Sequence, residues 1–173
     1  MSLKVAVLMG SANDAEKLQP ARDTLEQFGV EHEVWAMSAH RNAEAVREFV
    51  GSARENGFGV IIAAAGMAAH LAGACAANTT LPVIGLPVSG GALDGVDALY
   101  STVQMPPGIP VATVGVGPMG ATNAGHLAVS ILALQDVELR GKLEARRKKM
   151  TEEVLRKNKD LPGRLREILD NKK

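Results

Sequence analysis

The sequence predicts a three-layer α/β/α domain around a central parallel sheet, followed by an extended C-terminal helix. Short apolar runs alternate with segments of helical spacing, as expected for consecutive β–α–β units. The run Val60-Ile61-Ile62 is apolar on both faces, which is typical of a strand covered by helices on both sides. From Asp136 onward the composition changes abruptly to charged residues. We therefore expect an α/β/α domain at 1–135 and a helical extension of the same domain at 136–173.

The first half of the chain is expected to contain two strand–helix pairs. Its first apolar run ends at Gly10-Ser11, a pair that favours turns. Its helical patterns end at Gly29 and at Asn56-Gly57, residues common after a helix. Together these signals give a strand at 3–9, a helix at 15–28, a strand at 31–37 and a helix at 43–55.

The second half continues the alternation up to residue 134. Gly66 opens a helix of small residues, and the last helix of the domain is rich in Ala, Leu and Ile. A stiff, proline-dense connection at 104–110 precedes the final strand and suits either a binding pocket or a subunit contact. We expect strands at 59–64, 83–87 and 110–116, and helices at 66–77, 94–104 and 121–134.

The C-terminal extension has a narrow apolar stripe at helical spacing. Such a helix usually packs on a neighbouring subunit or across its own sheet. The basic run 146–149 is offset by nearby glutamates, which favours a solvated helix face over an anion site. Leu161-Pro162-Gly163 is expected to end this helix, with a short amphipathic turn after it. The stripe consists of Leu139, Leu143, Met150, Val154 and Leu155.

Composition excludes several classes of protein. Lys and Arg together number 19, as do Asp and Glu, so no net charge favours nucleic acid or an acidic membrane. The single cysteine, Cys75, excludes an internal disulfide and a multi-cysteine metal cluster, and we expect it to be a small buried residue. The sequence has no signal-peptide pattern and no apolar run near the ~20 residues of a membrane span. We expect a soluble, cytoplasmic protein.

The turn after the first predicted strand is a candidate anion site. Backbone N–H groups at a helix start, with the positive end of the helix dipole, attract phosphate. Ser11 and Asn13 add side-chain donors beside Gly10. Asp14 either caps the helix or accepts hydrogen bonds from ribose hydroxyls.

The segment Ser38-Ala39-His40-Arg41 follows the second predicted strand. Ligands of open α/β sheets bind at the carboxyl ends of the strands. A histidine there can transfer a proton near neutral pH, because its ordinary pKa is about 6.5. The guanidinium of Arg41 can bind an anion of the same ligand. The pair indicates chemistry on a charged small molecule, although His40 alone also fits a structural histidine at a strand end.

A third candidate segment begins at Gly66, after the third predicted strand. Its small residues permit a close approach of backbone to ligand. His70 either joins the pocket or forms a hydrogen bond within its own turn. We expect His32, at a strand start, and His126, in an alanine-rich helix, to be structural.

These segments, in this order, resemble the N5-carboxyaminoimidazole ribonucleotide mutase family of purine biosynthesis (class I), which is related to the aminoimidazole ribonucleotide carboxylases. The resemblance extends from residue 3 to about 155, and several motifs in one order are far more specific than any single motif. The similar pieces are MGSANDAE at 9–16, SAHR at 38–41, AAGMAAHLAG at 64–73, GLPV at 85–88, LDGVDALYSTVQMPPGIPVATV at 93–114 and the alanine-rich helix from Asn123.

The resemblance implies an isomerase that moves a carboxyl group from the carbamate nitrogen to carbon 4 of the imidazole. No metal, biotin or nucleotide cofactor is implied, and the partner subunits would form a homo-octamer. His40 would be the proton carrier, with Ser11 on phosphate, Asp14 on ribose and Arg41 on phosphate or carboxylate. The implied pocket is completed by Gly10, Asn13, Ser38, Gly66, Met67, Ala69, His70 and Leu71.

Three departures from the family pattern leave a second enzymatic activity possible as an alternative hypothesis. The family often has serine in place of Asn13, glycine in place of Met67 and proline in place of Ala72. The bulk of Met67 would reshape the carboxyl pocket, which leaves open a carboxylase (a lyase) that uses carbon dioxide directly. Those carboxylases tend to have lysine after the first histidine and to lack the second histidine motif. Arg41 and Ala69-His70-Leu71 therefore favour the mutase.

A different class of protein is a non-catalytic nucleotide- or phosphate-binding module on a flavodoxin-like sheet. A phospho-receiver needs an aspartate at the end of the third strand, where this chain has Ala63-Ala64-Ala65. A flavin carrier usually stacks its flavin on aromatic side chains, which make up only 3% of the residues. Neither variant fits, and fold alone does not decide function.

Overall fold

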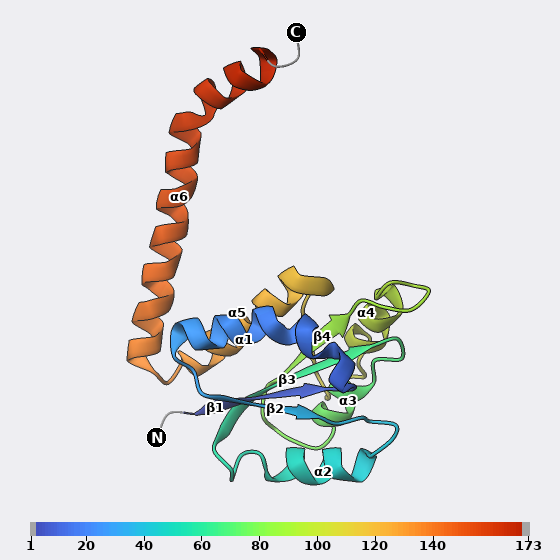
Figure 1. The fold of residues 1–173 in the computed structure, drawn as a ribbon. Coiled ribbons are helices and arrows are strands. Elements are labelled where there is room, and N and C mark those ends of the chain that lie inside the picture. The colour runs from blue at the N-terminus through green and yellow to red at the C-terminus, as the bar shows by residue number, and fades with distance from the viewer. Residues whose placement is uncertain (1–2, 171–173) are drawn as a thin grey trace.

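The computed structural model describes residues 3–170, and its centre is a five-stranded sheet (Figure 1). The strand order is β2-β1-β3-β4-β5, and all neighbouring strands pair in parallel. This order confirms the predicted α/β class, because parallel neighbours need crossover connections such as helices. The strands are β1 (Lys4–Met9), β2 (His32–Ala36), β3 (Phe58–Gly66), β4 (Val83–Val88) and β5 (Ala112–Thr113).

Helices cover both faces of the sheet, with α1 and α5 on one side and α2 on the other (Figure 1). Val7 and Ile62 pack in a core with residues of α1 and α5, whereas Leu8 and Ile61 pack in a second core with residues of α2 and α3. Alternate side chains of β1 and β3 thus enter opposite cores, which confirms the three layers. The helices are η1 (a 3-10 helix, Ala12–Leu18), α1 (Gln19–Phe28), α2 (Ala43–Ser52), α3 (Leu71–Ala76), α4 (Val96–Val103), α5 (Gly117–Leu132) and α6 (Val137–Asp170).

Cys75 belongs to the second core and is fully buried, as predicted. Burial raises the pKa of its thiol to about 12, because the thiolate would lose its hydration. The thiol therefore stays protonated and unreactive near neutral pH.

Several elements begin or end elsewhere than predicted. The first helix starts as the 3-10 helix η1 and becomes α-helical only at Gln19, because Pro20 has no N–H to donate to the preceding turn. The predicted helix 66–77 is reduced to α3, because β3 stays extended as far as Gly66, which pairs with Val88. The last strand has only two residues, and α5 already begins at Gly117.

The C-terminal helix α6 is longer than predicted. The prediction that Leu161-Pro162-Gly163 ends it is wrong, since α6 continues to Asp170 with Pro162 inside. Proline removes one intrahelical hydrogen bond, here to the carbonyl of Asn158, and a helix that continues through a proline bends there. Figure 1 shows a bend near the C-terminal end of α6.

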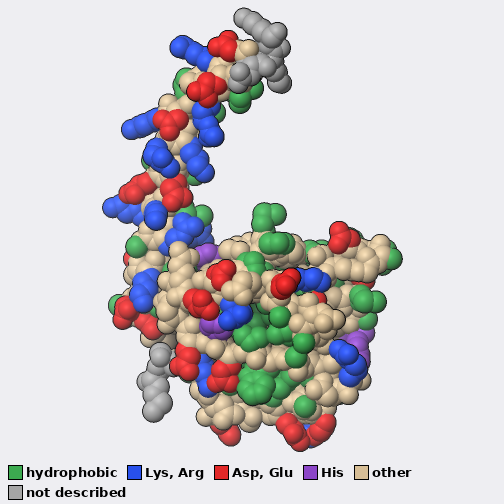
Figure 2. All heavy atoms as spheres, viewed as in Figure 1, with side chains coloured by type: hydrophobic (Ala, Val, Ile, Leu, Met, Phe, Trp, Pro, Cys, Tyr) green, Lys and Arg blue, Asp and Glu red, His purple; other side chains and the backbone are tan. Residues whose placement is uncertain are grey.

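Only the start of α6 packs on the domain. Leu139 is buried in the first core and Leu143 packs partly against it, while Met150, Val154 and Leu155 are exposed. Figure 2 shows Lys and Arg side chains interspersed with acidic ones along this helix, as predicted for a solvated face. No helix within residues 3–170 combines the length and apolarity that crossing a bilayer requires.

Candidate active site

A cleft with a volume of about 540 Å³ lies at the carboxyl ends of the central strands. Its lining comes from four segments that are distant in sequence: the turns after β1, β2 and β3, and the loop after β4. This is the edge where open α/β sheets bind their ligands, as the sequence predicts.

The turn after β1 presents polar groups to the cleft. Ser11 is the N-cap of η1, and its Oγ accepts a hydrogen bond from the N–H of Asn13 at 3.3 Å. Because Ser11 caps the helix, the carboxylate of Asp14 is left to face the cleft, which it lines. The N–H of Gly10 donates to the carbonyl of Ala64 at 3.0 Å, which ties this turn to the end of β3.

The turn after β2 is organised around Ser38. Its Oγ accepts hydrogen bonds from the N–H of His40 at 3.4 Å and from the N–H of Arg41 at 3.3 Å. The guanidinium of Arg41 reaches across to the turn after β1 and donates to the carbonyl of Gly10 at 2.8 Å. Arg41 therefore lies beside the Ser11 turn, so that two predicted anion-binding groups are neighbours in the cleft.

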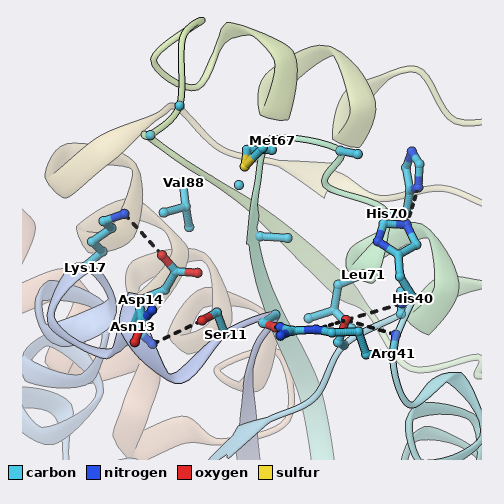
Figure 3. A pocket seen from close by; sticks show the side chains of 18 of the residues that line it. Ser11, Asn13, Asp14, Lys17, His40, Arg41, Met67, His70, Leu71 and Val88 are labelled. Carbon is cyan, nitrogen blue, oxygen red and sulfur yellow. Dashed lines mark hydrogen bonds and ion pairs between the residues drawn. The ribbon is translucent and has the colours of Figure 1, made fainter.

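Two imidazoles meet at the side of the cleft remote from Lys17 (Figure 3). His40 Nε2 and His70 Nδ1 are 2.7 Å apart, and the rings are nearly perpendicular, at 89° (Figure 3). At this distance one nitrogen carries the hydrogen and the other accepts it. Both histidines are exposed to the cleft. The pair can therefore pass a hydrogen between rings at the edge of the binding space.

The turn after β3 forms the wall between these groups. Met67 has a left-handed backbone, with φ of 57°, and its side chain is 62% exposed. Leu71 is buried but still lines the cleft, as does Gly66. Ala69 is buried and does not line the cleft, although its neighbour Ala68 does.

Several residues that line or support the cleft are not among the predicted site residues. Lys17 donates hydrogen bonds to Asp14 Oδ1 at 3.1 Å and to the carbonyl of Ser89 at 2.9 Å. Its spacing of three residues after Asp14 in a helical segment was the available signal. Asn42 Oδ1 accepts a hydrogen bond from the N–H of Ser38 at 2.6 Å and so fixes the turn before α2. Val88, Gly90 and Gly91 also line the cleft.

The other two histidines lie outside the cleft, as predicted. His32 begins β2, and its Nδ1 lies 3.3 Å from the carbonyl of Val30. His126, in α5, packs edge-on against Phe28 of α1, with ring centroids 5.5 Å apart. Partial burial lowers the pKa of His126, and the charges of Arg146 and Arg147 lower it further.

The polar groups of the cleft fit a ligand with an anion, hydroxyl groups and a site for proton transfer. Arg41 supplies positive charge, Asp14 supplies an acceptor for hydroxyl groups, and His40 with His70 supplies the site for proton transfer. Within residues 3–170, no three His, Cys, Asp or Glu side chains are grouped so that they could hold a metal ion.

Comparison with known proteins gives a consistent set of relatives. The sequence model of the AIR carboxylase family matches residues 4–153. The N5-carboxyaminoimidazole ribonucleotide mutase of Escherichia coli (strain K12) is 51% identical over 152 residues, 88% of this chain and 90% of that protein. The mutase of Vibrio vulnificus (strain CMCP6) is 49% identical over 153 residues, 88% of this chain and 95% of that protein.

Solved structures also match this chain in fold. The crystal structure of a Treponema denticola PurE2 variant has a TM-score of 0.82 and 27% sequence identity, and the match covers 93% of this chain and 99% of that one. The family match runs from β1 into α6, so it includes every residue that lines the cleft. With this match over most of its length, the chain belongs to the AIR carboxylase family.

Proposed function

We propose that this protein is an N5-carboxyaminoimidazole ribonucleotide mutase, an isomerase of de novo purine biosynthesis, with His40 as the proton carrier. The observation that carries the proposal is the contact of His40 with His70 in a cleft also lined by Ser11, Asp14 and Arg41. The relatives named for this reaction, about half identical over most of the chain, support the same activity.

The sugar-phosphate would bind along the turn after β1. Ser11 and Asn13 offer donors to the phosphate, and Arg41 lies close enough to share it, because its guanidinium already reaches Gly10. Asp14 would accept hydrogen bonds from the ribose hydroxyls. This orientation directs the imidazole of the substrate toward His40.

The reaction needs one proton to reach the carbamate nitrogen and one to leave carbon 4 of the imidazole. His40 would donate a proton to the carbamate nitrogen as the carbon–nitrogen bond breaks, releasing carbon dioxide and aminoimidazole ribonucleotide. Carbon 4 of the imidazole would then attack the carbon dioxide, and neutral His40 would remove the proton from carbon 4. The net result moves a carboxyl group from nitrogen to carbon and a proton from carbon to nitrogen, so that atoms and charges balance.

The intermediate carbon dioxide must not escape between these steps. Gly66, Met67 and Leu71 form the nearby wall, and Met67 has its side chain over the cleft. Excluding water from this region would also disfavour loss of the carboxyl group to solvent. Ala69 would support this wall from beneath, Ser38 would hold His40 and Arg41 in place, and His70 would exchange a hydrogen with His40.

Assembly and location follow from the same proposal. We propose a homo-octamer of the domain 1–135 with its extension 136–173. An exposed stripe on and before α4, spaced by three or four residues, supports contact between copies. A phosphorylated substrate does not diffuse across membranes, so the enzyme would work in the cytoplasm where that substrate is made. The apolar stripe at α4 consists of Leu93, Val96, Tyr100 and Val103. Sedimentation velocity tests the assembly, and a monomer would contradict it.

The decisive assay supplies N5-carboxyaminoimidazole ribonucleotide without ATP or bicarbonate and follows formation of the carbon-linked isomer. Rapid isomer formation is the expected result. Product formed only from aminoimidazole ribonucleotide and dissolved carbon dioxide would identify a carboxylase instead. No turnover of either substrate would favour a non-catalytic nucleotide-binding module.

A further inference from the structure

Lys17 joins two separate segments at the end of the cleft remote from the histidines (Figure 3). Its ammonium group donates to Asp14 Oδ1 at 3.1 Å and to the carbonyl of Ser89 at 2.9 Å. The side chain of Lys17 is 46% exposed and that of Asp14 only 16%. The lysine thus connects a mostly shielded carboxylate of η1 with the loop that follows β4.

The loop 89–91 passes close to both sides of the cleft. A Cβ atom at Gly90 would lie 3.8 Å from Lys17 Nζ, and one at Gly91 would lie 3.5 Å from Met67 Cγ. Gly91 also has a φ of 68°, which favours glycine. The loop therefore runs between Lys17 and Met67, and the hydrogen bond from Lys17 to the carbonyl of Ser89 connects it to η1.

Asp14 has one oxygen bound and one free. Oδ1 accepts from Lys17, whereas Oδ2 has no hydrogen-bond partner in the part of the chain that the structure describes. An aspartate without a neighbour would sample several rotamers and lose that freedom when a ligand binds. A lysine that fixes the carboxylate beforehand reduces this loss.

We propose that Lys17 is a positioning residue for the ribose: it directs Asp14 toward the sugar hydroxyls and links their binding to the loop 89–91. The inference rests on the proposed function, because a ribonucleotide must be the ligand. Lys17 acts through Asp14 and does not touch the reacting atoms. Its loss should therefore weaken binding and leave turnover nearly unchanged.

The test compares two ligands by titration calorimetry: the carbon-linked product and an analogue whose sugar lacks both hydroxyls. Lys17→Met should weaken product binding by about three- to tenfold, in the range expected for one charged hydrogen-bonding contact at a partly exposed site. The analogue should bind wild type and Lys17→Met equally. The value of kcat should stay within about twofold, and Lys17→Arg should restore most of the product affinity.

Lys142 offers a matched control. It also pairs with a carboxylate, Glu138, and donates to a carbonyl, that of Phe28, and its side chain is 45% exposed. It does not line the cleft. Lys142→Met should leave the affinity for both ligands unchanged.

Three results would overturn the inference. Unchanged product affinity in Lys17→Met would mean that Asp14 needs no positioning. Equal weakening of both ligands would mean that Lys17 binds the phosphate directly. A wild-type protein that neither binds nor converts the ribonucleotides would remove the proposed function too, and this is seen before any variant is made.

Discussion

The two walls of the cleft differ in composition and in how the chain builds them. The binding wall is the turn after β1, with Ser11, Asp14 and Lys17 within seven consecutive residues. The imidazole wall is His40 with His70, thirty residues apart, which meet because β2 and β3 lie on either side of β1. The binding wall carries charged groups and an acceptor for the hydroxyl groups of a ligand. The imidazole wall carries the rings that can transfer a proton. We expect affinity and rate to depend on different walls, so that variants separate them.

The largest effect should come from the imidazole wall. In His40→Asn the proton carrier is lost while a polar side chain of similar reach remains. We expect kcat to fall by ~10² or more and the Kd for the product to change by less than about tenfold. Steady-state kinetics and calorimetry measure the two quantities. If binding weakened as much as turnover, the two walls would not be separate.

Asp14→Asn should produce the opposite pattern in the binding wall. The substitution keeps the shape of the side chain but removes the charge that pairs with Lys17 and would accept ribose hydroxyls. We expect the Kd to rise by roughly ten- to thirtyfold, as for a lost charged hydrogen bond, with kcat within about threefold. A fall in kcat at unchanged Kd would assign Asp14 to chemistry instead.

His70→Asn should have a smaller effect than His40→Asn, because His70 acts on the proton carrier rather than on the substrate. Loss of its ring removes the partner 2.7 Å from His40 Nε2. We expect kcat to fall about tenfold with little change in Kd. His32→Asn, outside the cleft, is the matched control and should retain full activity. Equal losses in His40→Asn and His70→Asn would show that the two rings act as one unit.

Met67→Gly tests the turn after β3, which lies between the binding wall and the imidazole wall. Glycine relieves the left-handed backbone, whose cost for other residues is about 1 kcal/mol or more, although it also adds freedom to the unfolded chain. We expect the free energy of unfolding to rise by at most about 1 kcal/mol and kcat to change by less than about threefold. More of the decarboxylated intermediate, aminoimidazole ribonucleotide, should be released into solution.

Met67→Ala separates bulk from strain, because alanine keeps the strained backbone but shortens the side chain. It should release as much aminoimidazole ribonucleotide as Met67→Gly without the gain in stability. Product partitioning by chromatography and denaturant unfolding provide the two measurements. Unchanged partitioning in both variants would mean that Met67 does not retain carbon dioxide.

The two walls also differ in how far the sequence predicts them. Ser11 and Asp14 follow a strand directly, so their place at the sheet edge could be inferred from local pattern. The contact of His40 with His70 depends on strand order, which no local pattern specifies. The alanines around Met67 predict a helix there, but pairing of Gly66 with Val88 keeps the chain extended as far as Gly66. Pro162 was expected to end α6, yet the exposed helix tolerates one missing hydrogen bond.

The burial of Cys75 has a practical consequence for spectroscopy. Since the chain has no second thiol and this one is shielded and protonated, a cysteine placed at the exposed Ala92 would be labelled selectively by a maleimide dye. Fluorescence from that dye would follow the neighbouring glycine-rich loop during turnover, without first replacing the natural cysteine.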